Sequence, residues 1–467
     1  MQMTEAEDGT GAGAPAPRHR VQDLLSLPGF RRLLLVRWPA QLADGTFQVG
    51  AASLLLFTLN PFEETSAWAI AEVIAITTLP FTVVGPLAGV LIDRWVRQRV
   101  LVWSNVLRIL VILATLPLAS RFALGLDGGQ TAFYGGVLVA LSVNRFFLTT
   151  LGAVLPRVAP GEALVPANAI SATGGSVMTL AGAGAGGALA QVVGEDRGGP
   201  EAAVLVSLVL YALSALAAGR FPRRSLGPEL EDDLPPLRHA VGQATRDVVE
   251  GVRLTAATRR AWAPIAAFGL LRLSTMVASI AALLVFRNVY AGGPGDIAIV
   301  LVWFGVGVFA GAVGVTVLDR TTHARPETWI RLALAFTGVA IVALAPGLVR
   351  TNLIIMSALM GVGFGFAKVT ADTLVQGALP DRYRGRVFAA YDVIVNLMVA
   401  ASGVAAALTL PYAGAAERLY LVAGGLLVTT ALLSRRWLGS LPPAVDVETW
   451  DAAARALDDH RPERPTA

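Results

Sequence analysis

Long apolar runs separated by short polar segments are the dominant pattern along this chain. The hydrocarbon core of a bilayer takes about 20 apolar residues of helix. The pattern predicts twelve spans, six on each side of a polar stretch that runs from Arg220 to Arg260. The expected spans lie near residues 33–59, 66–91, 100–120, 131–155, 167–192, 201–219, 263–287, 296–318, 328–349, 352–376, 387–410 and 416–437.

These spans predict an all-α integral membrane protein, with twelve transmembrane helices in two pseudo-symmetric six-helix bundles. A two-fold internal repeat of this kind is typical of transporters. We expect a disordered cytoplasmic tail at 1–30 and bundles at 31–219 and 263–437. A cytoplasmic linker with an amphipathic helix at 220–262 separates the bundles, and a cytoplasmic tail occupies 438–467. The polar start, rich in Gly, Ala and Pro, predicts a tail rather than a signal peptide.

The placement of arginine predicts the orientation. Arginines gather in the segment before the first span and in every second connection, whereas the opposite connections carry about one each or none. Cytoplasmic loops carry the excess of positive charge in membrane proteins. We therefore expect a multi-pass protein of the cell (cytoplasmic or inner) membrane with both termini in the cytoplasm.

Composition excludes several other classes of protein. Only 15% of the residues are charged and 55% are hydrophobic, whereas a soluble domain carries about 25% charged residues. Without cysteine there is no disulfide, no thiol catalysis and no cysteine-bound zinc. The four histidines lie in polar segments, so no metal site is expected. No basic stripe with interleaved aromatic residues predicts a nucleic-acid partner, despite the net charge of +4.

Enzyme chemistry is not expected either. The chain has no Gly-x4-Gly-Lys-Ser/Thr loop for a nucleotide, no Asp-rich diphosphate motif and no pair of histidines at helical spacing. We therefore predict neither a cofactor nor a catalytic centre. The mean hydropathy of +0.62 agrees with a protein that lies largely within the bilayer.

The loop after the second expected span carries a family resemblance. The stretch from Gly85 to Arg99 reads Gly-Pro-Leu-Ala-Gly-Val-Leu-Ile-Asp-Arg-Trp-Val-Arg-Gln-Arg. It resembles the loop signature of the major facilitator superfamily, although Trp-Val replaces the second glycine. A degenerate copy lies in the second half, from Gly314 to Arg325. The segments 155–169 and 380–388 resemble the branch that includes the enterobactin exporter and related drug-efflux proteins.

The resemblance implies a conformational gate at this loop and at its copy. Such a cluster would hold the two halves together in one conformation and release them in another. The expected gate residues are Gly89, Asp93, Arg94, Arg97, Arg99, Asp319 and Arg320. The alternative is that the arginines only anchor the loop on the cytoplasmic side.

Two pairs of glycines four residues apart share a helix face and allow another helix to approach closely. They are Gly182 with Gly186 in span five and Gly307 with Gly311 in span eight. The first pair lies in a run similar to the glycine-rich fifth-span motif of exporters, but without its proline. Helix packing alone is the alternative interpretation.

Polar residues inside the spans are the candidates for function, since a charge at mid-bilayer costs about 2.5–3.5 kcal/mol. In span one, Arg37, Gln41, Asp44 and Gln48 fall on one helix face, so we expect them to line an interior cavity. Asp44 is the first candidate for a protonation site. A structural, hydrogen-bonded carboxylate is the alternative.

In span ten, Lys368 and Asp372 are four residues apart, and Lys368 is the only lysine in the chain. It could bind an anionic group of a substrate or form a structural pair with Asp372. Glu72 and Asp392 are further candidates for proton coupling. The other candidates for lining the cavity are Asn144, Arg145, Arg272 and Asn396, and Arg108 is expected to be architectural.

The prediction is thus a secondary active transporter that exports a small amphipathic molecule, drug-like or siderophore, by alternating access and proton-coupled antiport. Its partners would be the substrate, protons and the lipid bilayer, and a monomer would suffice. An importer or a lipid flippase on the same fold is the alternative, since a fold does not set substrate or direction.

Overall fold

The computed structural model describes residues 21–54, isolated positions between 68 and 92, and then most of the chain to residue 438. The later ranges are 94–123, 129–159, 161–194, 198–227, 236–290, 292, 294–322, 324–411 and 417–438. Within these ranges the chain is helical, with turns and short connections and without strands.

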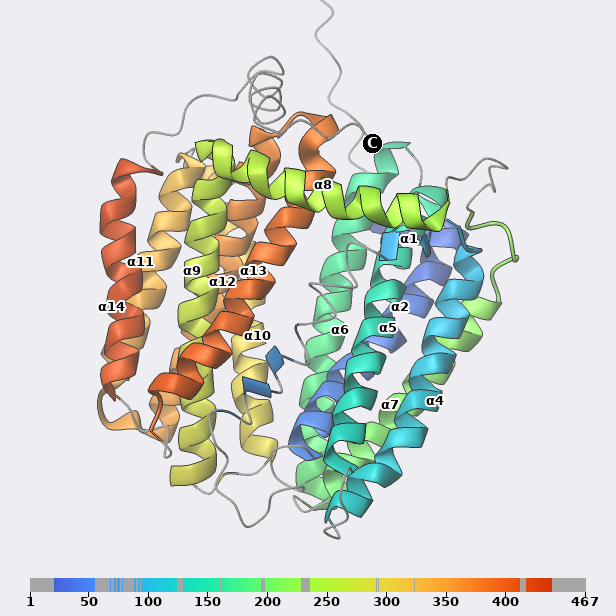
Figure 1. Cartoon of the computed structure of the whole chain (residues 1–467), viewed down its shortest axis with the longest axis horizontal. Coiled ribbons are helices and arrows are strands. Elements are labelled where there is room, and N and C mark those ends of the chain that lie inside the picture. Colours follow the sequence, from blue (N-terminus) through green and yellow to red (C-terminus); the bar gives the residue numbers. More distant parts are fainter. Residues whose placement is uncertain are drawn as a thin grey trace, which may run out of the picture.

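The helices form two groups that stand side by side (Figure 1). The first half consists of α1 (Val21–Ser26), α2 (Pro28–Ser53), α4 (Arg97–Ala123), α5 (Gly129–Val158), α6 (Leu164–Val193) and α7 (Gly198–Gly219). The second half consists of α9 (Arg259–Leu284), α10 (Pro294–Thr322), α11 (Pro326–Leu344), α12 (Arg350–Ala378), α13 (Asp381–Thr409) and α14 (Glu417–Leu433). Short 3-10 turns occupy Gly161–Ala163, Pro346–Leu348 and Ser434–Arg436, and a π-turn, Val285–Val289, extends α9.

The helix α8 (Leu237–Ala257) lies across one end of both groups (Figure 1). We call this end the α8 end and the opposite end the far end. This helix falls inside the linker predicted at 220–262, where the sequence predicts an amphipathic helix. Its attachment is to α13, because Arg386 Nε and Nη1 lie 3.1 Å from Asp247 Oδ1 and 3.0 Å from Glu250 Oε1.

Ten helices of the described ranges, α4 to α7 and α9 to α14, are long and apolar enough to cross a membrane. The helix α2 is equally long but more polar, since it carries Arg37, Gln41, Asp44 and Gln48. The second expected span falls mostly on residues outside the description. The all-helical membrane fold is thus confirmed, and the count of twelve stays a prediction. The expected N-terminal tail at 1–30 is too long, because helices begin at Val21 and Pro28.

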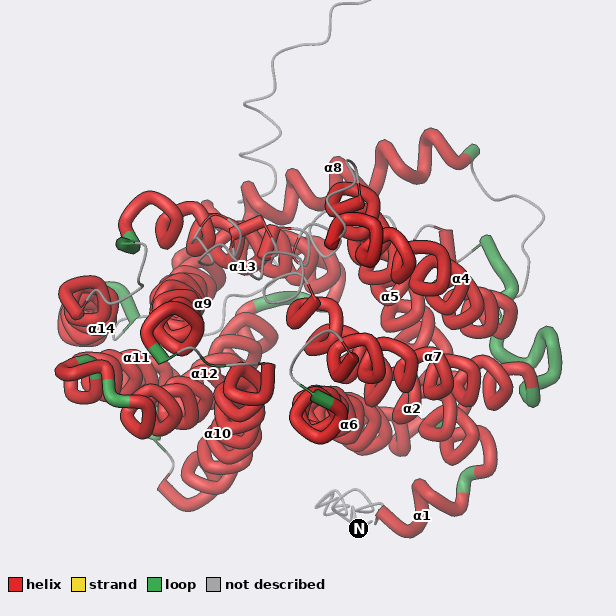
Figure 2. The backbone as a smooth tube through the Cα atoms, turned by 90° about the horizontal axis from the view of Figure 1, so that it is seen from below, coloured by secondary structure: helices red, strands yellow, loops and turns green. Residues whose placement is uncertain are grey.

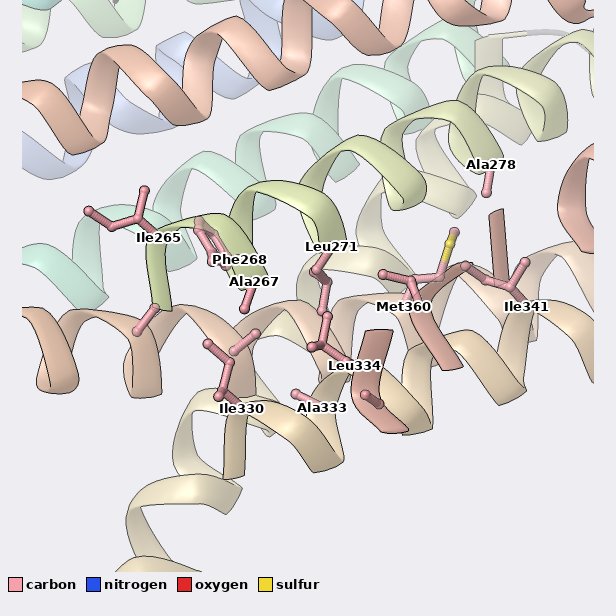
Figure 3. Packing of buried hydrophobic residues seen from close by; sticks show 14 of the residues in the cluster. Ile265, Ala267, Phe268, Leu271, Ala278, Ile330, Ala333, Leu334, Ile341 and Met360 are labelled. Atoms are coloured by element: carbon pink, nitrogen blue, oxygen red, sulfur yellow. The ribbon is translucent and has the colours of Figure 1, made fainter. Parts of the chain in front are cut away.

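The core of the second half lies where α9, α11 and α12 meet. Phe268 and Leu271 of α9 belong to one buried cluster with Leu334 of α11 and Met360 of α12 (Figure 3). Lipid tails are as apolar as these side chains, so close packing rather than transfer from water stabilises such a contact.

Glycines mark the places where helices cross most closely. A Cβ atom added to Gly307 or Gly311 of α10 would lie 2.0 Å from a backbone oxygen of α12. In the first half, a Cβ on Gly182 would lie 2.0 Å from the carbonyl oxygen of Leu42 in α2. A Cβ on Gly186 would lie 3.2 Å from the carbonyl oxygen of Thr46 in α2. Both expected glycine pairs therefore lie at crossings within one half.

The two halves touch each other toward the far end, where α6 packs against α10 (Figure 2). An added Cβ on Gly187 would lie 2.0 Å from Ala298 Cβ, and one on Gly305 would lie 2.0 Å from Leu180 Cδ2. Ile74 of the first half also belongs to a buried cluster with residues of α9 and α13. These contacts bring the two halves together on the far side.

Candidate functional site

Polar side chains in the membrane region gather at two places in the described structure. One is a buried network inside the first half, and the other is a cluster where the two halves face each other. The two clusters differ in exposure, and exposure determines whether a proton or a ligand can reach the charged groups.

The buried network centres on Arg108 of α4. Its Nη1 lies 2.7 Å from Asp44 Oδ1 on α2 and 3.1 Å from Asn144 Oδ1 on α5. The hydroxyl of Tyr211 on α7 donates to the same Asp44 oxygen over 2.8 Å. The guanidinium lies over the rings of Tyr211 and Phe147, 4.3 and 4.8 Å from their centroids. Four helices thus meet at one ion pair.

This ion pair is closed off from solvent, since Arg108 is 0% exposed and Asp44 is 4% exposed. Removing one member of a buried pair costs about 3–5 kcal/mol, because the other charge is left without compensation. In this conformation the pair links α2, α4, α5 and α7 of the first half. Sequence reasoning missed Tyr211, because nothing in the sequence distinguishes it from any other tyrosine in an apolar run.

The polar face of α2 does not line a single cavity, because neighbouring helices divide it. Arg37 Nε donates to Gln41 Oε1 over 2.7 Å, and its Nη1 donates to Ser171 Oγ of α6 over 2.8 Å. Asp44 faces the buried network, and Gln48 lines a pocket of about 310 Å³ between α2, α5, α6 and α10. The expectation of one shared cavity is therefore wrong for this conformation.

The second cluster, called here the interhalf cluster, consists of Arg145, Lys368, Asp372 and Asp392. Arg145 Nη2 on α5 lies 3.4 Å from Asp392 Oδ2 on α13, which joins the two halves. Lys368 Nζ lies 2.7 and 2.8 Å from the two carboxylate oxygens of Asp372. Asp392 also interacts electrostatically with Lys368 and Asp372. The four side chains therefore form one charged group.

The interhalf cluster is partly exposed although it lies near the middle of its helices. The side chains of Asp392 and Lys368 are 56% and 41% exposed, and those of Asp372 and Arg145 are 29% and 24% exposed. Charges facing lipid at this depth would be costly, and Asp392 points to the other half, where Arg145 is its partner. We conclude that water reaches the space between the halves.

Aromatic rings surround the interhalf cluster on the side of the second half. Lys368 Nζ lies 4.8 Å from the ring centroid of Tyr391, and the guanidinium of Arg272 lies 4.9 Å from that of Phe364. The rings of Phe268 and Phe364 are 5.2 Å apart. Such a site offers both charged and apolar surface to a ligand. Asn396, one turn after Asp392 on α13, is half buried. Glu72 is exposed and lies in the segment between 68 and 92, of which the structure describes only a few positions.

The family follows from comparison with known proteins. The family model described as Major Facilitator Superfamily matches residues 34–403. The chain belongs to the major facilitator superfamily. Uncharacterized MFS-type transporters of Mycobacterium tuberculosis and Mycobacterium bovis are each 31% identical over 407 residues, covering 86% of this chain and 89% of theirs. The family predicted from the loop motif is thus confirmed, and the chain is a membrane transporter.

Solved superfamily structures share the fold at low sequence identity. A POT family transporter in complex with 5-aminolevulinic acid has a TM-score of 0.68 at 11% identity, covering 88% of this chain and 96% of that one. A bacterial homologue of the iron transporter ferroportin, inward-facing, has 0.66 at 15%, covering 90% and 100%. The nucleoside transporter NupG has 0.60 at 10%, covering 88% and 100%. These likenesses establish the superfamily fold and leave the cargo open.

The expected gate of the superfamily loop is only partly described. Arg97 donates from Nη1 to the carbonyl of Ala153 over 3.1 Å and from its backbone N–H to Gly227 over 3.0 Å, both within the first half. Asp319 accepts from Trp329 Nε1 over 3.1 Å within the second half. Gly89 is half buried, whereas Asp93 and the side chain of Arg320 fall outside the description. The gating role stays a prediction.

The described residues contain no group of three or more His, Asp or Glu side chains that could hold a metal ion. Transporters of this superfamily are typically not enzymes. The interhalf cluster presents charged side chains beside aromatic rings.

Proposed function

We propose that this superfamily member is a proton-coupled exporter of a small amphipathic molecule, which binds at the interhalf cluster and moves by alternating access. The observation that carries the proposal is the ion pair of Arg145 and Asp392, because it joins the two halves in a space open to solvent. The working unit is one chain in the cell membrane.

Asp392 is a better coupling residue than Asp44, the first candidate from the sequence. A solvent-exposed ion pair contributes about 0–1 kcal/mol, so a proton or a substrate can displace its partner readily. The buried pair of Asp44 and Arg108 is several times costlier to open. Asp44 therefore supports the first half, and Asp392, with Asp372 beside it, is left to exchange protons.

The contacts between the halves support alternating access. The two halves pack against each other through α6 and α10 toward the far end, while charged side chains at the interhalf cluster are exposed. Arginine placement predicts that the α8 end is cytoplasmic. With that orientation the structure represents a cytoplasm-facing state, ready to take cargo from inside the cell.

Competition for the carboxylates would couple export to proton uptake. A cationic group on the cargo and a proton cannot both neutralise Asp392, so binding one releases the other. That exchange is antiport. The rings of Phe268, Phe364 and Tyr391 suit the apolar part of such a cargo.

One observation favours an importer or a flippase of anionic amphiphiles instead. The cluster pairs two cationic side chains with two carboxylates, and a third cation, Arg272, lies over Phe364, whose ring is 5.2 Å from that of Phe268. An anionic cargo would bind Arg145 or Lys368 more tightly once Asp392 is protonated. Proton and cargo would then travel together, which is symport.

Proteoliposomes with the purified protein distinguish these cases. A panel of fluorescent cations and anions is followed with and without a pH gradient, where one pH unit supplies about 1.36 kcal/mol per proton. We expect a lipophilic cation to move in the direction opposite to proton flow. The Asp392→Asn variant should no longer respond to the pH gradient. The control is Asp296→Asn, which removes the carboxylate partner of Arg350 at the far end. Anion uptake along the proton gradient would establish the alternative.

A further inference from the structure

A groove on the outer face of α4 and α5 is separate from the space between the halves. It has a volume of about 530 Å³ and is lined by Arg94, Trp95, Arg99, Trp103, Leu107 and Phe146, among others. Neither the superfamily fold nor the proposed transport cycle assigns it a ligand.

The groove opens sideways, into the bilayer. Only 33% of the most apolar part of α4, within Arg97–Pro117, is buried within the protein. Trp103 is 63% exposed and Leu107 is 44% exposed, and both belong to the groove. A molecule that reaches this surface comes from the surrounding lipid rather than from water.

Polar and apolar groups are ordered along the groove as they are along a phospholipid. Arg94 and Arg99 lie at the α8 end, around the start of α4. Deeper in the membrane the lining changes to Trp103 and Leu107. Trp95 stacks on Phe146 of α5, with their ring centroids 6.4 Å apart. Tryptophan prefers the level of the headgroups, which places the arginines at the membrane surface.

The second half provides an internal comparison. A groove of about 510 Å³ lies on α10, α11 and α12, lined by residues such as Trp329, Phe336 and Phe366 and by no charged side chain among the described ones. Both grooves can take an acyl chain. Only the first also presents two cations, so charge is a property of this groove and not of helix packing in general.

We propose that an anionic phospholipid of the leaflet at the α8 end occupies this groove, with its headgroup phosphate at Arg94 and Arg99 and an acyl chain along Trp103 and Leu107. Basic pockets between transmembrane helices bind anionic headgroups in this way. The loop arginines then have different tasks. Arg97 holds α4 to α5 and to the turn at Gly227, whereas the exposed Arg99 faces the lipid headgroup.

The test is a titration of the delipidated, purified full-length protein with phosphatidylglycerol or phosphatidylcholine, read by native mass spectrometry and by quenching of tryptophan fluorescence with brominated acyl chains. We expect tighter binding of phosphatidylglycerol. Arg99→Gln should weaken it about fivefold, as expected from about 1 kcal/mol for one surface arginine. Arg99→Lys should keep most of the affinity, because the charge remains.

The matched control is Arg223→Gln, which removes an exposed arginine from the turn after α7 without touching the groove. It should bind phosphatidylglycerol as the wild type does. Equal affinity of the wild type for both lipids would overturn the proposal. So would an equal loss in the Arg99→Gln and Arg223→Gln variants, because the effect would then be one of net charge alone.

Discussion

Arg108 and Asp44 face each other across 2.7 Å with both side chains closed off from solvent, so the first half is built around a buried ion pair. Three further groups, from Asn105, Asn144 and Tyr211, complete the hydrogen bonds of the pair. A buried pair with satisfied hydrogen bonds fixes the relative positions of its helices. Its disruption should therefore affect folding before it affects transport.

We predict that Asp44→Asn destabilises the protein by about 3–5 kcal/mol, because the Arg108 charge stays buried without its partner. Thermal unfolding in detergent should show a clearly lower midpoint. The exposed pair provides the control, since Asp392→Asn should change stability by no more than about 1 kcal/mol. A wild-type midpoint in Asp44→Asn would return Asp44 to the list of coupling residues.

A double variant tests the interpretation of this loss. Replacing both members, as in Asp44→Asn with Arg108→Gln, removes the buried charge together with its partner. The double variant should be more stable than the sum of the two single losses predicts, by about 0.5–3 kcal/mol. Strict additivity would mean that the two side chains contribute independently.

The absence of native cysteine makes the opening between the halves measurable. Gln376 is exposed on the face of α12 that carries Lys368 and Asp372, whereas Val399 is 4% exposed in the far-end cluster. We predict that Gln376→Cys reacts with an impermeant maleimide added from the α8 end and that Val399→Cys does not react from either side. Fast labelling of Val399→Cys alone would mean that the far end is the open one.

Local spacing in the sequence predicted the features that depend on a single helix. The i, i+4 spacing of Lys368 and Asp372 gave their contact, and glycines four apart gave the crossings at Gly182 and Gly307. The expected shared cavity along α2 failed because α6, α4 and α7 approach it from different sides. The spacing of residues within one helix does not predict which other helix packs against each polar side chain.

The decisive ion pairs join residues that are far apart along the chain. Asp44 and Arg108 are separated by 64 positions, and Arg145 and Asp392 by 247. The sequence identified each of these residues as a charge in an apolar run, but their partners depend on how the helices are arranged. Only the arrangement of the helices therefore distinguishes the buried carboxylate of Asp44 from the exposed carboxylate of Asp392.

Ion pairs should add only a small, salt-sensitive part to the attachment of α8 to α13, beside the buried packing of Leu254. Both ion pairs of Arg386, with Asp247 and Glu250, are partly exposed, and each such pair contributes about 0–1 kcal/mol. We predict that Arg386→Gln speeds hydrogen exchange in α8 a few-fold and that high salt has the same effect on the wild type. The control is Arg238→Gln, at the exposed start of α8, which should exchange as the wild type does.

Closure at the far end depends on the absence of a side chain at Gly187, where a Cβ would lie 2.0 Å from Ala298 Cβ. We predict that Gly187→Val separates α6 from α10 and shifts the protein toward a state open at the far end. In that background Val399→Cys should become reactive from the far side, while labelling of Gln376→Cys should slow. The control is Gly152→Val on α5, where an added Cβ meets nothing within 4 Å. Because the two reporters lie on opposite sides of the interhalf cluster, alternating access requires opposite changes. A parallel rise in both would mean that Gly187→Val merely loosens the bundle.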